Sequence, residues 1–255
     1  MNTVTIKNLT LGSGKPKICL PIVGKTLEEI TGQAQNIIKN PVDIIEWRAD
    51  WFADINDLSK TTAAIDAIHS AIGDIPLLFT IRTSNEGGEL SINFEDYSHI
   101  LTEVATNPHV NAIDVEILIA KEDAIKNLIR ILKSSCIVIA SSHDFNKTPA
   151  SSDITERLIY MEQCGAQVCK MAVMPQNTDD VLSLLLATNL AQKKLNSPVI
   201  TMSMGKYGLI SRLCGEVFGS SLTFGCVGCA SAPGQIDANE LNTVLEIIHK
   251  NITMD

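Results

Sequence analysis

The sequence lacks any apolar run of about 18 residues, the length that a membrane-spanning helix requires. Its first residues, Met-Asn-Thr-Val-Thr-Ile-Lys-Asn, also lack the apolar segment of a signal peptide. Closely spaced cysteine pairs are nearly absent, because the seven cysteines are scattered through apolar segments, as is usual for reduced, packed thiols. We therefore expect a cytoplasmic protein with reduced cysteines.

Basic charge is also scarce. The chain has 20 Lys and Arg against 29 Asp and Glu, a net charge of −9, and no cluster of Lys and Arg stands out from this acidic background. Proteins that bind nucleic acid or anionic membranes usually present such a cluster. The composition therefore argues against both partners and favours a small molecule.

Motifs for metals and nucleotides are missing or incomplete. Residues 226–229, Cys-Val-Gly-Cys, have the spacing of a zinc ligand pair, but no second close pair accompanies them. Residues 24–26, Gly-Lys-Thr, resemble the end of a phosphate-binding loop, yet Cys19 occupies the position of that loop's first glycine. No glycine-rich dinucleotide fingerprint follows the first predicted strand either. We therefore expect no metal ion and no nucleotide cofactor.

Short apolar or β-branched runs recur every few tens of residues, with helical patterns between them. Strands that alternate with helices form a parallel sheet, and eight such units in 255 residues match an α/β fold of the (β/α)8 TIM barrel type. An open doubly wound sheet is the alternative. We predict one barrel domain over residues 1–255, a hairpin of residues 3–6 and 9–11 capping its bottom, and a helix N-cap at Thr178. The predicted strands are residues 18–23, 43–47, 77–81, 112–117, 136–140, 167–173, 199–202 and 222–224.

Polar and charged side chains collect where these strands end, which is where barrel enzymes carry their active sites. The two-residue spacing of Glu46 and Arg48 puts a carboxylate and a guanidinium on the same side of one strand. Arg48 with Glu46, and Arg82 with Glu86, are also compatible with purely structural ion pairs. The remaining strand ends carry Asp114, Glu116, His143, Lys170, Met204 and, beyond the last of these, Arg212. So many polar ends in succession predict a site at the mouth of the barrel.

Lys170 lies in the segment Gly-Ala-Gln-Val-Cys-Lys-Met-Ala-Val-Met, whose apolar residues leave its ammonium group no route to the surface along the strand. Burial and nearby cations disfavour the charged form and leave a neutral amine. The cations expected nearby are Arg48, Arg82 and Arg212. A neutral amine attacks carbonyl carbons, and the protonated imine that results acidifies hydrogens on the adjacent carbon. His143, on the neighbouring predicted strand, is the candidate to remove such a hydrogen, unless it is a core histidine bonded to a carbonyl.

Three other functions would use parts of this pattern. A Schiff-base aldolase also needs a buried lysine but usually binds a phosphorylated sugar, whereas Arg212 suits a planar carboxylate. A metal-dependent lyase on Glu46, Asp114 and Glu116 conflicts with the interleaved arginines, and we favour a structural role for Asp114 and Glu116. A barrel that only binds a sugar acid leaves the buried lysine beside a histidine without a purpose.

Six segments carry a family resemblance: DIIEWRAD, LLFTIRTSNEGGE, SSHDFNKTP, KMAVMPQ, TMSMGKYGLISRLCGEVFGS and ASAPGQI. In order and spacing, over essentially the whole chain, they resemble type I 3-dehydroquinate dehydratase of the shikimate pathway. The resemblance implies a (β/α)8 enzyme of aromatic amino acid biosynthesis that needs no cofactor and is usually a homodimer. It also implies syn dehydration of 3-dehydroquinate to 3-dehydroshikimate through a lysine Schiff base.

The same resemblance implies roles for individual residues. Lys170 would form the Schiff base, His143 would transfer protons, and Glu86 would orient the histidine. The implied substrate-binding residues are Glu46, Arg48 and Arg82 around the ring hydroxyls, Met204 on the ring, Arg212 on the ring carboxylate, and Ser231 and Gln235 as a lid. Departures from the family pattern, which affect first-strand contacts and the lid, are Pro21, Cys226 and Cys229.

Overall fold

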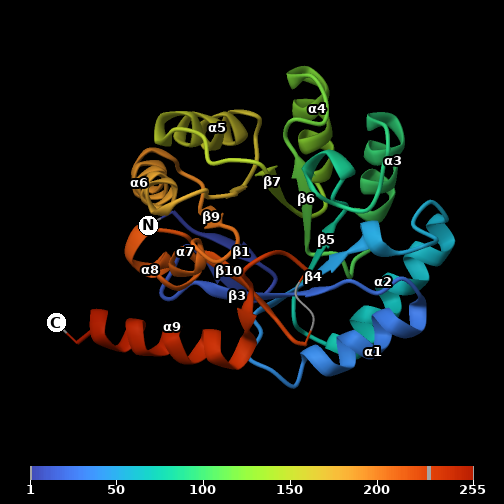
Figure 1. Ribbon diagram of the computed structural model, residues 1–255. Coiled ribbons are helices and arrows are strands. Elements are labelled where there is room, and N and C mark those ends of the chain that lie inside the picture. The colour runs from blue at the N-terminus through green and yellow to red at the C-terminus, as the bar shows by residue number, and fades with distance from the viewer. Residues whose placement is uncertain (1, 229–230, 255) are drawn as a thin grey trace.

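The computed structural model, which describes residues 2–228 and 231–254, has a curled parallel sheet at its centre with helices around it (Figure 1). The order of neighbouring strands is β11-β10-β3-β4-β5-β6-β7-β8-β9, so each strand from β3 to β9 pairs with the next along the chain. The strands are β3 (Lys17–Ile22), β4 (Ile44–Arg48), β5 (Leu77–Thr80), β6 (Ala112–Glu116), β7 (Ile137–Asp144), β8 (Val168–Val173), β9 (Val199–Ser203), β10 (Leu222–Cys226) and β11 (Ile236–Asp237).

The sheet closes where β9, its last strand, meets the residues that directly precede β10. A single parallel bridge joins Val199 and Ser220, and the Ser221 backbone N–H donates to the Val199 carbonyl at 2.9 Å. Serine side chains complete the seam, because the Ser220 hydroxyl accepts from the Thr201 backbone N–H at 3.0 Å. The sheet therefore closes into the predicted (β/α)8 barrel rather than an open doubly wound sheet.

A short antiparallel hairpin closes the amino-terminal end of the barrel, as predicted. It consists of β1 (Val4–Ile6) and β2 (Leu9–Leu11), with Ile6 opposite Leu9. Ile6 and Leu11 are fully buried and belong to one cluster with inward-facing residues of all eight barrel strands. The strand residues of that cluster include Cys19, Ile44, Leu78, Ala112, Ile139, Val168, Ile200 and Leu222. The lower interior is thus a packed apolar plug, which leaves the opposite end for polar side chains.

Helices cover the outside of the barrel, and their ends follow local sequence signals. Thr26 caps the first helix in a reciprocal capping box with Glu29, and Gly73 ends the second. The N-cap predicted at Thr178 is wrong, because Asn177 caps that helix and accepts from the Asp180 backbone N–H. None of the described helices combines the length and apolar character needed to cross a membrane. The helices are α1 (Leu27–Ile37), α2 (Leu58–Ile72), α3 (Phe94–Val104), α4 (Glu122–Leu132), α5 (Ser151–Gln163), α6 (Thr178–Lys194), α7 (Leu209–Leu213), α8 (Gly215–Phe218) and α9 (Ala238–Ile252), with 3-10 turns η1 (Ala49–Trp51) and η2 (Ser84–Glu86).

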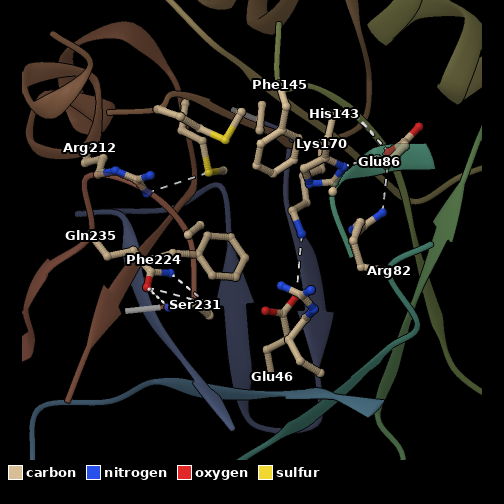
Figure 2. Close-up of a pocket in the computed structure, with 16 residues that line it drawn as sticks. Glu46, Arg82, Glu86, His143, Phe145, Lys170, Arg212, Phe224, Ser231 and Gln235 are labelled. Atoms are coloured by element: carbon tan, nitrogen blue, oxygen red, sulfur yellow. Dashed lines mark hydrogen bonds and ion pairs between the residues drawn. The ribbon is translucent and has the colours of Figure 1, made fainter. Parts of the chain in front are cut away.

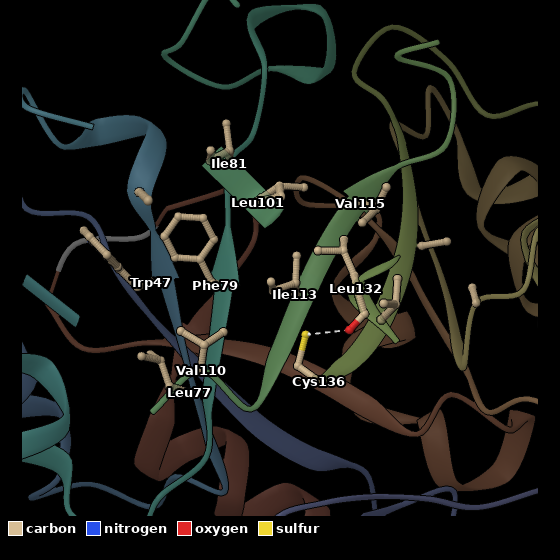
Figure 3. Packing of buried hydrophobic residues seen from close by; sticks show 14 of the residues in the cluster. Trp47, Leu77, Phe79, Ile81, Leu101, Val110, Ile113, Val115, Leu132 and Cys136 are labelled. Atoms are coloured by element: carbon tan, nitrogen blue, oxygen red, sulfur yellow. Dashed lines mark hydrogen bonds between the residues drawn. The ribbon is translucent and has the colours of Figure 1, made fainter. Parts of the chain in front are cut away.

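The main hydrophobic core lies between the outer face of the strands and these helices. Figure 3 shows Phe79 and Ile113 on neighbouring strands, with Leu101 and Leu132 from surrounding helices. Phe79 contacts Trp47 edge to face, with ring centroids 5.4 Å apart. Because alternate strand residues point outward into this core, the residues between them point into the barrel, and those at the carboxyl ends build the pocket.

Candidate active site

A pocket opens at the carboxyl ends of the barrel strands (Figure 2). All ten site residues expected from the sequence line it: Glu46, Arg48, Arg82, Glu86, His143, Lys170, Met204, Arg212, Ser231 and Gln235. Six further lining residues were not singled out in advance: Gly87, Phe145, Ala172, Met202, Phe224 and Ala232. The two-residue period of a strand could have identified two of these, because it places Ala172 beside Lys170 and Met202 beside Met204 on the inner face.

Lys170 lies on β8 with only 3% of its surface exposed, so the sequence-based expectation of burial is confirmed. The same pocket is lined by the arginines expected nearby, Arg48, Arg82 and Arg212. The contacts that sequence-based reasoning did not include are carboxylates, since the Nζ atom lies 3.1 Å from Asp114 Oδ2 and 3.6 Å from Glu46 Oε1. Two carboxylates therefore balance a positive charge on this nitrogen, which answers how a buried strand accommodates a lysine.

His143 and Glu86 form a hydrogen-bonded pair beside the lysine strand. His143 Nδ1 lies 2.8 Å from Glu86 Oε2, which also accepts from the His143 backbone N–H at 2.9 Å. Burial lowers the pKa of His143 well below its usual range, and the cations Arg82 and Lys170 add to this effect. Burial raises the pKa of Glu86 to about 8, with Arg82 opposing the shift. The imidazole is thus kept neutral and oriented, as a general base requires.

Arg82 is the centre of a buried ion-pair network. Its guanidinium contacts Asp114 at 2.7 Å, Glu116 at 3.0 Å and Glu86 at 3.5 Å. Burial by itself would raise the pKa of Asp114, but Arg82 and then Lys170 outweigh it and hold that pKa below its usual range. Asp114 therefore stays ionised and links the arginine network to Lys170, a contact that the sequence did not indicate.

Arg48 pairs with Asp50 instead of Glu46, which corrects the structural pair considered from the sequence. Two parallel hydrogen bonds, from Nε to Oδ1 and from Nη2 to Oδ2, are each 2.8 Å long. Asp50 lies in η1, directly after the strand, and also accepts from the Arg82 backbone N–H at 3.2 Å. Glu46 instead accepts from the Thr80 hydroxyl at 3.0 Å and faces Lys170. Sequence reasoning missed Asp50, although it stands in the same EWRAD segment.

Arg212 is a buried guanidinium without a carboxylate partner among the described residues. It is 1% exposed, and its contacts are the Pro233 carbonyl at 3.0 Å and the Met202 sulfur at 3.8 Å. Burial lowers its pKa to about 10. A guanidinium in this setting is suited to bind a planar anion that enters the pocket.

The segment that carries Ser231 and Gln235 lies over this side of the pocket. The Gln235 side chain holds the segment in shape, since its Oε1 accepts from the Ser231 backbone N–H at 2.7 Å. The Pro233 carbonyl accepts from the Gly205 backbone N–H at 3.1 Å as well as from Arg212. Cys229, one of the expected departures from the family pattern, lies outside the described residues.

The chemistry of the pocket comes from amine, imidazole, guanidinium and carboxylate groups. Within residues 2–228 and 231–254, no group of three or more His, Cys, Asp or Glu side chains is arranged to hold a metal ion. The pocket thus combines the buried Lys170, the neutral His143 on the neighbouring strand and Arg212, whose guanidinium has no carboxylate partner among the described residues. These groups suit covalent chemistry on a carbonyl that belongs to a small anion.

Sequence comparison places the chain among proteins of one activity. A sequence model described as type I 3-dehydroquinase matches residues 18–252. The chain is 47% identical to the 3-dehydroquinate dehydratase of Listeria monocytogenes serotype 4a (strain HCC23), over 98% of this chain and 99% of that protein. It is 46% identical to the 3-dehydroquinate dehydratase of Clostridioides difficile (strain 630), over 98% of each chain.

Structural comparison agrees. The crystal structure of type I 3-dehydroquinate dehydratase from Clostridium difficile, with covalently modified comenic acid, superimposes with a TM-score of 0.94 at 45% identity over 98% of each chain. The 3-dehydroquinate dehydratase of Geobacillus kaustophilus HTA426 gives a TM-score of 0.94 at 34% identity, over 97% of this chain and 96% of that one. Both structural similarities cover nearly the whole chain.

Proposed function

The chain belongs to the type I 3-dehydroquinase family, and on this basis we propose that it converts 3-dehydroquinate to 3-dehydroshikimate through a Schiff base on Lys170. The reaction removes water, so the enzyme is a carbon–oxygen lyase of the shikimate pathway. The observation that carries the proposal is Lys170 itself, a buried lysine on the inner face of β8 that lines the pocket. The covalently modified comenic acid in the Clostridium difficile relative supports covalent chemistry in this family.

The first half of the proposed reaction is addition to the ketone. Lys170 Nζ first gives one proton to a neighbouring base, and the neutral amine then bonds to the carbonyl carbon. The carbonyl oxygen takes up that proton and a second one from the nitrogen and leaves as water, so that a protonated imine remains. Asp114 and Glu46 lie close to the same nitrogen and would balance its charge. The positive imine then withdraws electrons from the adjacent carbon.

The second half is elimination. His143 removes a proton from the carbon next to the imine and passes it to the hydroxyl group on the following carbon, which leaves as water from the same face. Glu86 holds the ring of His143 through the 2.8 Å contact to Nδ1, which leaves Nε2 for proton transfer. Hydrolysis of the imine then releases 3-dehydroshikimate and restores the lysine. The reaction needs no cofactor.

Recognition of the substrate follows from the remaining lining groups. Arg212, which has no carboxylate partner among the described residues, would bind the ring carboxylate as a fork. Glu46, Arg48 and Arg82 would contact ring hydroxyls, and Met204 would pack on the ring. Ser231 and Gln235 would complete the enclosure, because their segment is tied to Arg212 through the Pro233 carbonyl.

Borohydride trapping tests the proposal. Reduction in the presence of 3-dehydroquinate should attach the substrate to Lys170 and to no other lysine, as located by peptide mass spectrometry. In His143→Ala the imine should still form, while turnover falls by roughly a hundred- to ten-thousandfold, the usual share of a positioned acid–base group. The variant should therefore accumulate the Lys170 adduct with little release of 3-dehydroshikimate.

Two lysine variants control the trapping experiment. Lys170→Arg should abolish both the adduct and turnover, whereas Lys206→Arg, an exposed lysine in the loop after β9, should retain them. An adduct on Lys25 or Lys206, or none at all, would remove the Schiff-base assignment. Near-normal turnover in His143→Ala would remove the histidine from proton transfer and direct attention to Glu86 or Glu46.

The wider setting is part of the same proposal. We place residues 1–255 in one barrel domain, since the main core joins residues from β3 through α9. The exposed apolar side chains Leu182, Leu186, Ile210 and Val217 on α6, α7 and α8 support a homodimer in which a second copy covers them. The free, buried thiols of Cys19, Cys136, Cys164, Cys169 and Cys214 support a reducing cytoplasm.

A further inference from the structure

We propose that the ring of Phe224 is an electrostatic partner of the Lys170 nitrogen and stabilises the positive charge of the Schiff base through its π face. The inference rests on the proposed Schiff-base function and deepens it, because it assigns a residue to the charge of the covalent intermediate. Phe224 is the middle residue of β10 and carries no charge, so it is not one of the polar strand ends from which the site was predicted.

The geometry is that of a cation above a ring. Lys170 Nζ lies 4.7 Å from the centroid of the Phe224 ring, inside the distance of about 6 Å at which an aromatic face attracts a cation. Both side chains are buried, with 3% of Lys170 and 5% of Phe224 exposed, so water does not weaken the attraction. Figure 2 shows the ring next to the nitrogen end of the lysine.

The other groups around the nitrogen act through hydrogen bonds or at longer range. Asp114 from β6 and Glu46 from β4 lie 3.1 and 3.6 Å from Nζ. His143 from β7 and Cys19 from β3 are within electrostatic range of the lysine. The ring of Phe224 from β10 is thus an uncharged contact of Nζ, and it needs no donor hydrogen.

Imine formation changes what each contact can do. An ammonium group carries three hydrogens; when it condenses with a ketone, two leave with the carbonyl oxygen as water, and one hydrogen and the positive charge remain. The one hydrogen that the iminium keeps can serve the 3.1 Å hydrogen bond to Asp114, whereas Glu46 at 3.6 Å lies beyond hydrogen-bond distance and acts through its charge. Attraction to a ring face likewise depends on charge and distance and survives the conversion. We assign to Phe224 a share of the stabilisation of the cation that does not depend on the number of donor hydrogens.

Fluorinated phenylalanines separate this electrostatic role from a packing role. Each added fluorine weakens the negative face of the ring with little change in shape, so Phe224 is replaced with singly, doubly and triply fluorinated phenylalanine in the His143→Ala enzyme. The fraction trapped by borohydride with 3-dehydroquinate is then measured from neutral to alkaline pH. The trapped fraction does not depend on pH while the free lysine and the adduct both carry a positive charge. It falls at higher pH, where the free lysine is neutral and only the adduct carries a charge.

If Phe224 stabilises the cation, the alkaline end of that constant range moves to lower pH with each fluorine, by about 0.4–1.5 pH units over the series. Trapping that is unchanged across the fluorinated series, both in its fraction and in its alkaline end, overturns the inference and leaves Phe224 with packing alone. Absence of any adduct with unmodified Phe224 instead refutes the Schiff-base function. The control is the same series at Phe79, a buried ring of the outer core, which should leave the alkaline end in place.

Discussion

At the scale of single residues, the Glu86–His143 pair shows how burial sets proton chemistry. The pKa of Glu86 is raised to about 8 and that of His143 is lowered, so near pH 7 the carboxyl group is mostly protonated and the imidazole is neutral. Keeping both groups uncharged in a low-dielectric pocket limits the desolvation cost of the site and leaves a neutral imidazole as the proposed base. The arrangement also links the stability of the protein to pH.

Glu86 should make the folded state less stable as pH rises through neutrality. Its folded pKa is about 8 against an ordinary value of 4.5, so between these values the folded chain binds the extra proton and the free energy of unfolding falls as pH rises. His143 acts in the opposite direction, but its contribution is complete above its ordinary value of 6.5. From pH 6.5 to 8 we therefore expect Glu86 to lower the free energy of unfolding by up to about 1.4 kcal/mol per pH unit.

Urea unfolding of the wild type and Glu86→Gln across this range measures the effect. The variant should lose the decline with pH because glutamine cannot ionise. Glu89→Gln, an exposed position in the same loop, should keep the wild-type slope. Equal slopes in wild type and Glu86→Gln would show that Glu86 is already ionised throughout the range.

Sequence reasoning found the charged residues of the site and the contacts of Glu86 with Arg82 and His143, but not the partners of Arg48 and Lys170. Period-2 alternation correctly put Glu46 and Arg48 on the inner face. It could not foresee that the chain turns into η1 directly after Arg48, which brings Asp50 within 2.8 Å of the guanidinium. The carboxylate contacts of Lys170 were missed because Asp114 comes from a strand two places away in the barrel. Alternation fixes the face of a side chain, whereas pairing depends on the turn that follows the strand and on the neighbouring strands.

At the scale of elements, strands were predicted well where they are apolar and less well where they become functional. The predicted strand 136–140 continues as β7 to Asp144, because Ser141 to Asp144 keep pairing with β8 although they are polar. Polar residues usually signal the end of a strand, but here two of the four face the polar network of the pocket: Ser141 contacts Asp114 and Arg82, and His143 contacts Glu86. The family resemblance supplied the roles that local pattern could not.

The segment above the pocket depends on one glycine. Gly234 has φ +79°, and a Cβ atom there would lie 2.6 Å from the Gly205 carbonyl oxygen. Gly234→Ala should displace the Pro233 carbonyl from Gly205 and Arg212 and, at a strain cost of about 1–3 kcal/mol, lower kcat/KM roughly fivefold or more. The free energy of unfolding should fall by no more than this strain cost, because the segment lies outside the core. Steady-state kinetics and urea unfolding measure the two effects.

Gly14→Ala is the matched control for Gly234→Ala. Gly14 also has a positive φ, +66°, but a Cβ atom there meets nothing within 4 Å. In this variant the backbone strain should lower the free energy of unfolding, while the steady-state kinetics stay normal. If Gly234→Ala also kept normal kinetics, the contact between the segment and the loop after β9 would have no role in catalysis.

At the scale of the whole molecule, the barrel interior is divided into an apolar lower half and a charged upper half. Ile6 and Leu11 of the hairpin fill the lower end, while Lys170 and its partners occupy the mouth. This division was predictable, because the apolar hairpin precedes the first strand and the polar residues follow strand ends. It implies that stability and chemistry can be changed separately.

Ile6→Ala tests that separation. Removing a fully buried isoleucine from the plug should lower the free energy of unfolding by about 2–5 kcal/mol, while borohydride trapping at Lys170 stays normal below the unfolding transition. Thr5→Ala, on the exposed side of the same strand, should change stability by less than about 0.5 kcal/mol. Loss of trapping in folded Ile6→Ala would mean that the hairpin also positions the lysine.

The seam between β9 and β10 gives the barrel an uneven stiffness around its circumference. A continuous ladder from Ile139 to Asp144 joins β7 to β8, which carry the proposed base and the nucleophile, whereas β9 and β10 meet through one bridge and a few serine hydroxyls. Arg212, the proposed anion-binding residue, and the segment above the pocket lie on the loosely joined side. The side proposed to recognise the substrate is therefore the one that can yield to an incoming ring, while the side proposed to break and make bonds is held by the continuous ladder.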